Sequence, residues 1–108
     1  MTEYGRNGEV IMFVTYQGNA ESRFDRRYYV ERHVPMLREV FGPLGLTSAR
    51  AFFPPSQDTG TIAICECRYR DEAALAACYA SAEMPGLAAD IGNFTDIMPV
   101  QVRAALPW

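Results

Sequence analysis

Hydrophobic residues follow two patterns along the chain, namely short apolar runs typical of strands and three- to four-residue repeats typical of helices. The first run covers residues 9–16 (EVIMFVTY), is rich in β-branched and aromatic side chains, and ends at the polar segment QGNAES. Both of its faces are apolar, with Val10, Met12 and Val14 on one side and Ile11 and Phe13 on the other. We therefore predict a central strand that is covered on both sides.

A helical repeat follows from Asp25 onward. The residues that recur at steps of three or four are Tyr29, His33, Leu37, Val40, Phe41 and Leu44. Asp25 is a suitable N-cap, and Phe24 before it can pack on the first turn. Pro35 lacks a backbone donor and crowds the carbonyl of Glu31, so we predict a kink or a break there.

The remaining pattern gives two strands, a helical region and a final strand. The strands cover residues 46–53 and 61–69, a helix starts near Asp71, the segment MPGLAADI forms another short helical turn, and the last strand covers residues 96–104. The predicted order is βαββαβ in one domain, residues 1–108.

This order predicts an α+β fold of the ferredoxin-like type, with a four-stranded antiparallel sheet and both helices on one face. The strands then lie in the order 4, 1, 3, 2. The first strand is central, as its two apolar faces require, and Pro99 lies in an edge strand, where a missing donor is tolerated.

Helices on one side leave the other apolar face of this sheet uncovered. The third predicted strand repeats the pattern, because Ile62 and Ile64 alternate with Ala63, Cys65 and Cys67. An exposed apolar face of this kind marks an interface or a ligand site. We predict a homodimer in which two subunits form an α+β barrel.

Composition and charge exclude several classes of function. The net charge is −3, and the ten basic residues are scattered arginines, so no nucleic-acid-binding surface is expected. There is no lysine for Schiff-base chemistry. Without a leader or a long apolar segment, we expect a cytoplasmic protein with no membrane contact and with three reduced cysteines.

The densest cluster of reactive side chains is RFDRRYYVERHVP, residues 23–35. Tyr29 and His33 lie one helical turn apart and share a face. In an apolar pocket His33 can act as acid or base, and Tyr29 can orient it or donate to an oxyanion. The alternative is a structural histidine that bonds a backbone carbonyl.

A second cluster, NFTDIMP at residues 93–99, places Asn93, Thr95 and Asp96 at the start of the last predicted strand. Asp96 can orient His33 as carboxylates orient catalytic imidazoles. The alternative is turn chemistry, in which these side chains satisfy backbone donors.

Aromatic side chains supply candidate walls for a hydrophobic pocket, although most of them serve the core. We assign substrate binding to Phe13, Tyr28, Phe41, Asn93 and Thr95. One histidine and no spaced cysteine pairs predict no metal site, and no glycine-rich phosphate loop predicts no nucleotide cofactor.

The segments FDRRYYVERHVPM and IGNFTDIMPVQV together resemble the EthD family, whose members carry an FDxxYYxxxHxP helix and an NFTDIxP strand start. The resemblance spans nearly the whole chain and implies a dimeric α+β barrel with a cavity between sheet and helices. Related barrels include cofactor-free monooxygenases, isomerases and cyclases, and EthD proteins are commonly labelled oxidoreductases. The matching residues are Phe24, Asp25, Tyr28, Tyr29, His33, Pro35, Asn93, Thr95 and Asp96.

Two functions follow as hypotheses. One is an enzyme that acts on a small hydrophobic molecule, aromatic or carbonyl-bearing, with His33 as acid or base, Tyr29 as orienting group and Asp96 behind them. Any oxidation then uses substrate-activated oxygen, or a flavin or heme bound from outside. The other is a binding or accessory protein that holds such a compound without converting it. In a third interpretation, Tyr29 and His33 only join the first helix to the sheet.

Overall fold

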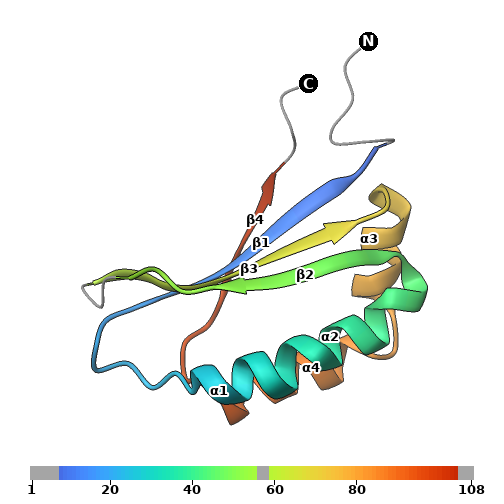
Figure 1. Ribbon diagram of the computed structural model, residues 1–108. Helices are drawn as coiled ribbons and strands as arrows, with labels where there is room; N and C mark the ends of the chain where they lie inside the picture. The colour runs from blue at the N-terminus through green and yellow to red at the C-terminus, as the bar shows by residue number, and fades with distance from the viewer. Residues whose placement is uncertain (1–7, 56–58, 105–108) are drawn as a thin grey trace.

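The computed structural model describes residues 8–55 and 59–104, and its elements follow the predicted order (Figure 1). The strands are β1 (Val10–Gly18), β2 (Leu46–Phe52), β3 (Gly60–Tyr69) and β4 (Val100–Ala104). The helical segments are α1 (Arg26–Tyr28), η1 (Tyr29–His33), α2 (Val34–Phe41), η2 (Gly42–Leu44), α3 (Glu72–Ala80), α4 (Met84–Asp90) and η3 (Ile91–Asn93).

The four strands form one antiparallel sheet in the order β2-β3-β1-β4, which confirms the predicted topology with β1 inside and β4 at an edge. The last strand begins later than predicted, at Val100 instead of Asp96. Pro99 directly precedes it, so the missing amide of Pro99 falls outside the ladder.

Both helix starts are capped by the expected carboxylates. Asp25 accepts a hydrogen bond from the amide of Tyr28 at 3.0 Å, and Asp71 accepts one from the amide of Ala74 at 2.8 Å. Each cap satisfies an amide that the first helical turn leaves without a partner. The N-terminal boundaries could therefore be predicted correctly from sequence.

The first helix does not break at Pro35. Instead, α1, η1 and α2 follow one another without a gap, and the turn before Pro35, from Tyr29 to His33, is a π-helix (Figure 1). The amide of Val34 donates to the carbonyl of Tyr29, a step of five residues. The wider π turn moves the preceding backbone carbonyls away from the ring of Pro35, and it does not need the backbone hydrogen bond that Pro35 cannot donate. The irregularity predicted at Pro35 is therefore a π turn and not a break.

The helices lie on one side of the sheet, and the main core fills the space between them (Figure 1). The buried side chains on this face include Met12 and Tyr16 of β1, Cys65, Cys67 and Tyr69 of β3, and Tyr29, Phe41, Leu87 and Phe94 opposite them. The strand register places alternate residues such as Phe13 and Val102 on the other face.

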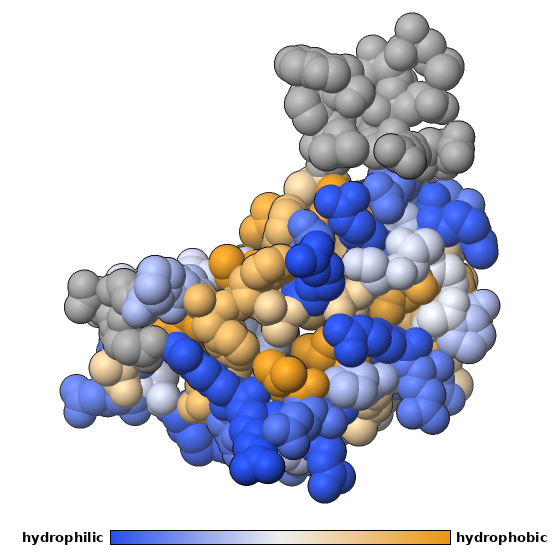
Figure 2. Space-filling view, in the orientation of Figure 1, coloured by the Kyte–Doolittle hydropathy of each residue, from blue (hydrophilic) through white to orange (hydrophobic). Residues whose placement is uncertain are grey.

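That other face carries exposed apolar side chains. Val100, Val102 and Phe52 are roughly half exposed, and Phe13 and Ile64 are cross-strand neighbours of Val102 and Phe52. Figure 2 shows apolar surface along the strands, bordered below by hydrophilic side chains of the helical layer. Within residues 8–55 and 59–104, no helix covers this face, and it carries the exposed apolar side chains that the sequence pattern predicts.

Candidate functional site

A partly open cavity of about 70 Å³ lies between the sheet and the helices. Its wall is mainly aromatic and aliphatic, and it includes Tyr29, His33 and Phe41 from the first helix and Tyr16, Cys65 and Cys67 from the sheet. The volume is below the roughly 300–1,000 Å³ of typical ligand pockets. A ligand larger than a few heavy atoms therefore requires the helices or the cavity mouth to open.

His33 is held by a buried carboxylate. Its Nδ1 atom lies 2.8 Å from an oxygen of Asp90, the last residue of α4, and both residues are buried. An ionised carboxylate only accepts hydrogen bonds, so Nδ1 is assigned the hydrogen and its N–H donates a hydrogen bond to Asp90. When the ring is neutral, its Nε2 atom is the acceptor, on a side chain that lines the cavity.

Asp90 collects three donors. The hydroxyl of Tyr28 donates to it at 2.7 Å and the side-chain amide of Asn93 at 3.0 Å, in addition to His33. Burial alone would raise the pKa of Asp90, but the hydrogen bonds from Tyr28, His33 and Asn93 outweigh it and hold that pKa below its ordinary value. The carboxylate is therefore ionised and ready to stabilise an imidazolium at His33.

The aromatic side chains around His33 restrict its ring. Tyr29 stacks on the imidazole with ring centroids 5.7 Å apart and an interplanar angle of 15°, and Phe94 lies 4.8 Å from it. Burial is the main reason that the pKa of Tyr29 is raised, with the neighbouring Cys65 adding to it. The phenol of Tyr29 therefore stays protonated and can only serve as a neutral donor or acceptor.

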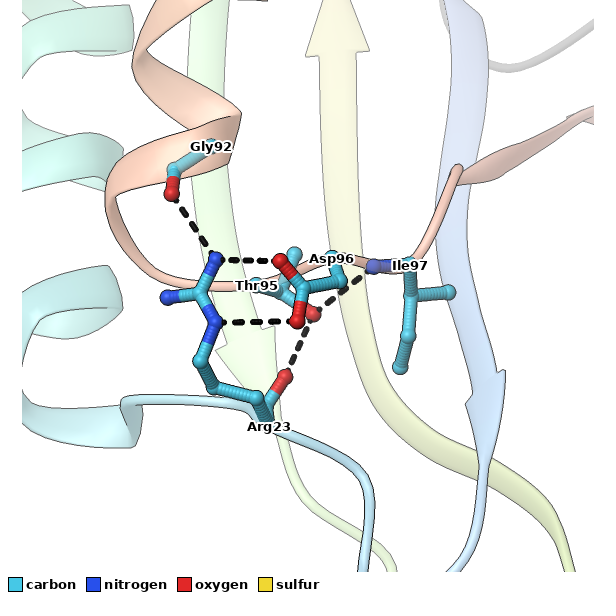
Figure 3. Close-up of polar contacts among 5 residues, drawn as sticks. All are labelled: Arg23, Gly92, Thr95, Asp96 and Ile97. Atoms are coloured by element: carbon cyan, nitrogen blue, oxygen red, sulfur yellow. Dashed lines mark hydrogen bonds and ion pairs between the residues drawn. The ribbon is translucent and has the colours of Figure 1, made fainter.

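Asp96, which the sequence analysis placed behind His33, lies elsewhere. It forms two hydrogen bonds with the guanidinium of Arg23, at 2.8 and 3.1 Å, and its side chain is 79% exposed (Figure 3). Arg23 also donates to the carbonyl of Gly92 at 2.9 Å. The predicted contact between Asp96 and His33 is therefore wrong, and Asp96 instead ties the segment before α1 to the segment before β4.

Thr95 bonds to backbone groups of a turn, which was the alternative interpretation of the NFTDIMP segment. Its hydroxyl donates to the carbonyl of Arg23 at 2.6 Å and accepts from the amide of Ile97 at 3.1 Å (Figure 3). Thr95 is buried but does not line the cavity. Its predicted contact with substrate is not supported by this geometry.

Of the four other residues predicted to contact substrate, one lines the cavity and three do not. Phe41 lines the cavity. Tyr28 and Asn93 do not line it but donate hydrogen bonds to Asp90. Phe13 pairs with Val102 on the opposite face of the sheet, so it does not contribute to this cavity.

Asp90 is the residue that the sequence analysis missed. A signal for it exists, because Leu87, Asp90 and Asn93 are spaced by three residues and the first two are buried. A carboxylate at the C-terminal end of a helix is disfavoured by the helix dipole. An acid at an apolar position there therefore requires a specific partner.

The sheet order and the helix arrangement define an α+β protein of the ferredoxin-like class, and no helix in residues 8–55 or 59–104 is long and apolar enough to cross a membrane. Residues 19–97 match the sequence model of the EthD domain. The chain belongs to the EthD family. Among proteins with curated descriptions, none is significantly similar to it in sequence.

Several solved structures share the fold. An EthD-like protein from Ralstonia eutropha is 23% identical with a TM-score of 0.79, and the alignment covers 91% of each chain. A Dabb family protein with a ferredoxin-like fold from Mesorhizobium loti is 12% identical, with a TM-score of 0.63 and coverage of 94% of this chain and 98% of that one. SnoaB, a cofactor-independent oxygenase from Streptomyces nogalater, is 10% identical, with a TM-score of 0.62 and coverage of 89% and 92%.

Proposed function

We propose that this EthD-family protein binds a small hydrophobic molecule, aromatic or carbonyl-bearing, and performs acid–base chemistry on it with His33. The observation that carries the proposal is the 2.8 Å contact between Nδ1 of His33 and the buried Asp90, on a histidine that lines an apolar cavity. Nε2 accepts a proton from the ligand, and Asp90 stabilises the imidazolium that results.

Such a base supports either of two outcomes for the ligand. Returning the proton to another carbon isomerises it. Alternatively, a deprotonated hydroxyaromatic or enolate is electron-rich enough to reduce oxygen directly, and this gives an oxidoreductase without a cofactor. The second outcome is supported by the shared fold of SnoaB, which is described as a cofactor-independent oxygenase.

The proposal is tested with 4-nitrophenol, whose phenol and phenolate forms absorb at different wavelengths. At a pH below its own pKa, binding to the wild-type protein is expected to produce phenolate as His33 takes the proton. His33→Ala is expected to keep the affinity within about threefold but to produce no phenolate, because only the base is removed. Arg32→Ala, an exposed neighbour in the same π turn, is the matched control.

Oxygen uptake with a panel of hydroxyaromatic compounds measures turnover in the same variants. Loss of the base is expected to lower the rate by about 10²- to 10⁴-fold. Equal ionisation and equal affinity in wild type and His33→Ala would instead show a binding protein. A lower melting temperature as the only change would show a structural histidine.

We further propose that the exposed apolar face of the sheet forms a homodimer interface that completes an α+β barrel. Val102→Asp is expected to convert a dimer into a monomer in analytical ultracentrifugation, because it places a charge among the exposed apolar side chains of this face, on the edge strand β4. Val30→Asp is the matched control, since Val30 is 44% exposed on the helical layer and Val102 is 48% exposed on the sheet. A dimer that survives Val102→Asp alone, with normal circular dichroism, would contradict this interface.

A further inference from the structure

Two cysteines lie side by side in the cavity wall. Cys65 and Cys67 occupy alternate positions of β3, so both point to the helix side of the sheet. Their sulfur atoms are 3.6 Å apart, and both residues are buried and line the cavity beside Tyr29 and His33. The thiols therefore face each other and the same small space.

The strand geometry allows these sulfurs to bond. Residues two apart on a strand have α-carbons separated by about 6.6–6.8 Å. Disulfides span up to about 6.8 Å between α-carbons, so the pair is at the upper limit and needs only a small adjustment. Cys78 provides an internal contrast, because it is buried on α3, does not line the cavity, and its thiol points to the carbonyl of Phe41 at 3.8 Å.

The two thiols are not equivalent. A hydrogen bond from Cys67 lowers the pKa of Cys65 despite its burial, whereas the same bond and burial raise the pKa of Cys67. Cys65 is therefore the better nucleophile, and Cys67 is placed to react with it afterwards. A metal is the less suitable partner, because no group of three or more His, Cys, Asp or Glu side chains forms a metal site in the described parts of the chain.

We propose that Cys65 and Cys67 form a reversible oxidation site for hydrogen peroxide in the wall of the cavity. The Cys65 thiolate attacks one peroxide oxygen, the O–O bond breaks, and a sulfenic acid and one water form once the released hydroxide takes the thiol proton. The Cys67 sulfur then attacks the Cys65 sulfur, the S–O bond breaks, and the oxygen leaves as a second water. Two thiols and one peroxide thus give a disulfide and two waters, and a thiol reductant restores the pair.

This inference goes beyond the proposed acid–base function and does not depend on it. The size of the cavity supports it independently, since a space of about 70 Å³ admits a peroxide more readily than a large oxidant. A bond between Cys65 and Cys67 also changes the wall next to Tyr29, whose ring stacks on His33. Oxidation is therefore expected to alter the surroundings of the imidazole.

The test is mass spectrometry of the reduced full-length protein before and after hydrogen peroxide, with free thiols alkylated under denaturing conditions. Trypsin cleaves after arginine, so residues 51–68 form one peptide that holds Cys65 and Cys67, and Cys78 falls in another. We expect the first peptide to lose the mass of two hydrogen atoms and both alkyl groups. Dithiothreitol should reverse this, and Cys78 should remain alkylated.

Cys78→Ser is the matched control and should form the same bond as the wild type. Cys67→Ser should instead stop at a sulfenic acid on Cys65, which dimedone traps, because the thiol that lies 3.6 Å from Cys65 is gone. The proposal is overturned if peroxide consumes Cys78 as fast as the pair, if the pair stays fully alkylated, or if the disulfide links two chains. Each of these results is read from the wild-type protein, so a variant that fails to fold does not weaken the test.

Discussion

Phe94→Ala is expected to lower the free energy of unfolding by about 3–5 kcal/mol, because it removes a fully buried ring from the centre of the aromatic core. The ring centroid of Phe94 lies 4.9 Å from that of Tyr29 and 5.3 Å from that of Phe24, in addition to its contact with His33. Phe24, Tyr29 and His33 therefore lose a packing partner that they share. Urea denaturation at one fixed protein concentration measures the loss, since association would add to apparent stability.

Two further variants calibrate that measurement. Phe94→Leu keeps most of the apolar volume and is expected to cost clearly less than the alanine variant. Met98→Ala, four residues along the chain and 83% exposed, is expected to change stability by less than about 0.5 kcal/mol. If Phe94→Ala were as mild as Met98→Ala, the packing around His33 described above would be incorrect.

Asp90→Ala is expected to lower the free energy of unfolding by about 2–4 kcal/mol, because Tyr28, His33 and Asn93 all lose the acceptor that they share. Asp96→Ala is the matched control, since that carboxylate is mostly exposed and an exposed ion pair contributes little. Urea denaturation near neutral pH compares the two. Similar losses in both variants would contradict the assignment of Asp90 as the buried carboxylate of the site.

The effect of Asp90 should also depend on pH. Its folded pKa is lowered, so its contribution to stability is fully present above the unfolded value of about 3.9 and is lost as the pH falls through the folded pKa. The stability difference between wild type and Asp90→Ala should therefore narrow in acid. A difference that widens on acidification would mean that the carboxylate is protonated in the folded protein.

Asp90→Asn removes the charge of this side chain but nearly keeps its shape, so it separates the two contributions. The amide keeps the volume and one acceptor, so this variant is expected to be more stable than Asp90→Ala. It no longer stabilises an imidazolium, so the ionisation of 4-nitrophenol should fall as it does in His33→Ala. Normal ionisation in Asp90→Asn would show that His33 acts without its carboxylate.

The order and the topology of the strands could be predicted because they depend on local patterns. Short apolar runs rich in β-branched and aromatic residues identified the strands, Asp25 and Asp71 identified the helix starts, and the two apolar faces of β1 identified the central strand. Each of these signals is carried by neighbouring residues. The last strand was predicted too long because Ile97, Met98 and Pro99 are apolar and continue the pattern of β4. In the structure Asp96 pairs with Arg23, and Thr95 bonds the backbone.

The carboxylate that contacts His33 could not be identified from the sequence, because its identity depends on how α4 packs against η1. Three acids follow α3, namely Glu83, Asp90 and Asp96. Asp96 belongs to the NFTDIMP segment, whereas Asp90 lies at the end of α4. Periodicity says which face of α4 is buried but not which residue it meets. The π turn was missed for a related reason, since Pro35 forbids a regular helix without specifying which alternative replaces it.

The hydrogen bonds that build the site join residues far apart in the chain, and this has a consequence for how the protein acquires function during synthesis. His33 and Asp90 are separated by 57 positions, Tyr28 and Asp90 by 62, and Arg23 and Asp96 by 73. Closing such long loops is slow compared with forming a helix turn. A nascent chain can therefore form β1, its first helix and the β2–β3 pair while the cavity still lacks Asp90, and the hydrogen bonds around His33 form only after Asp90 and Asn93 have left the ribosome.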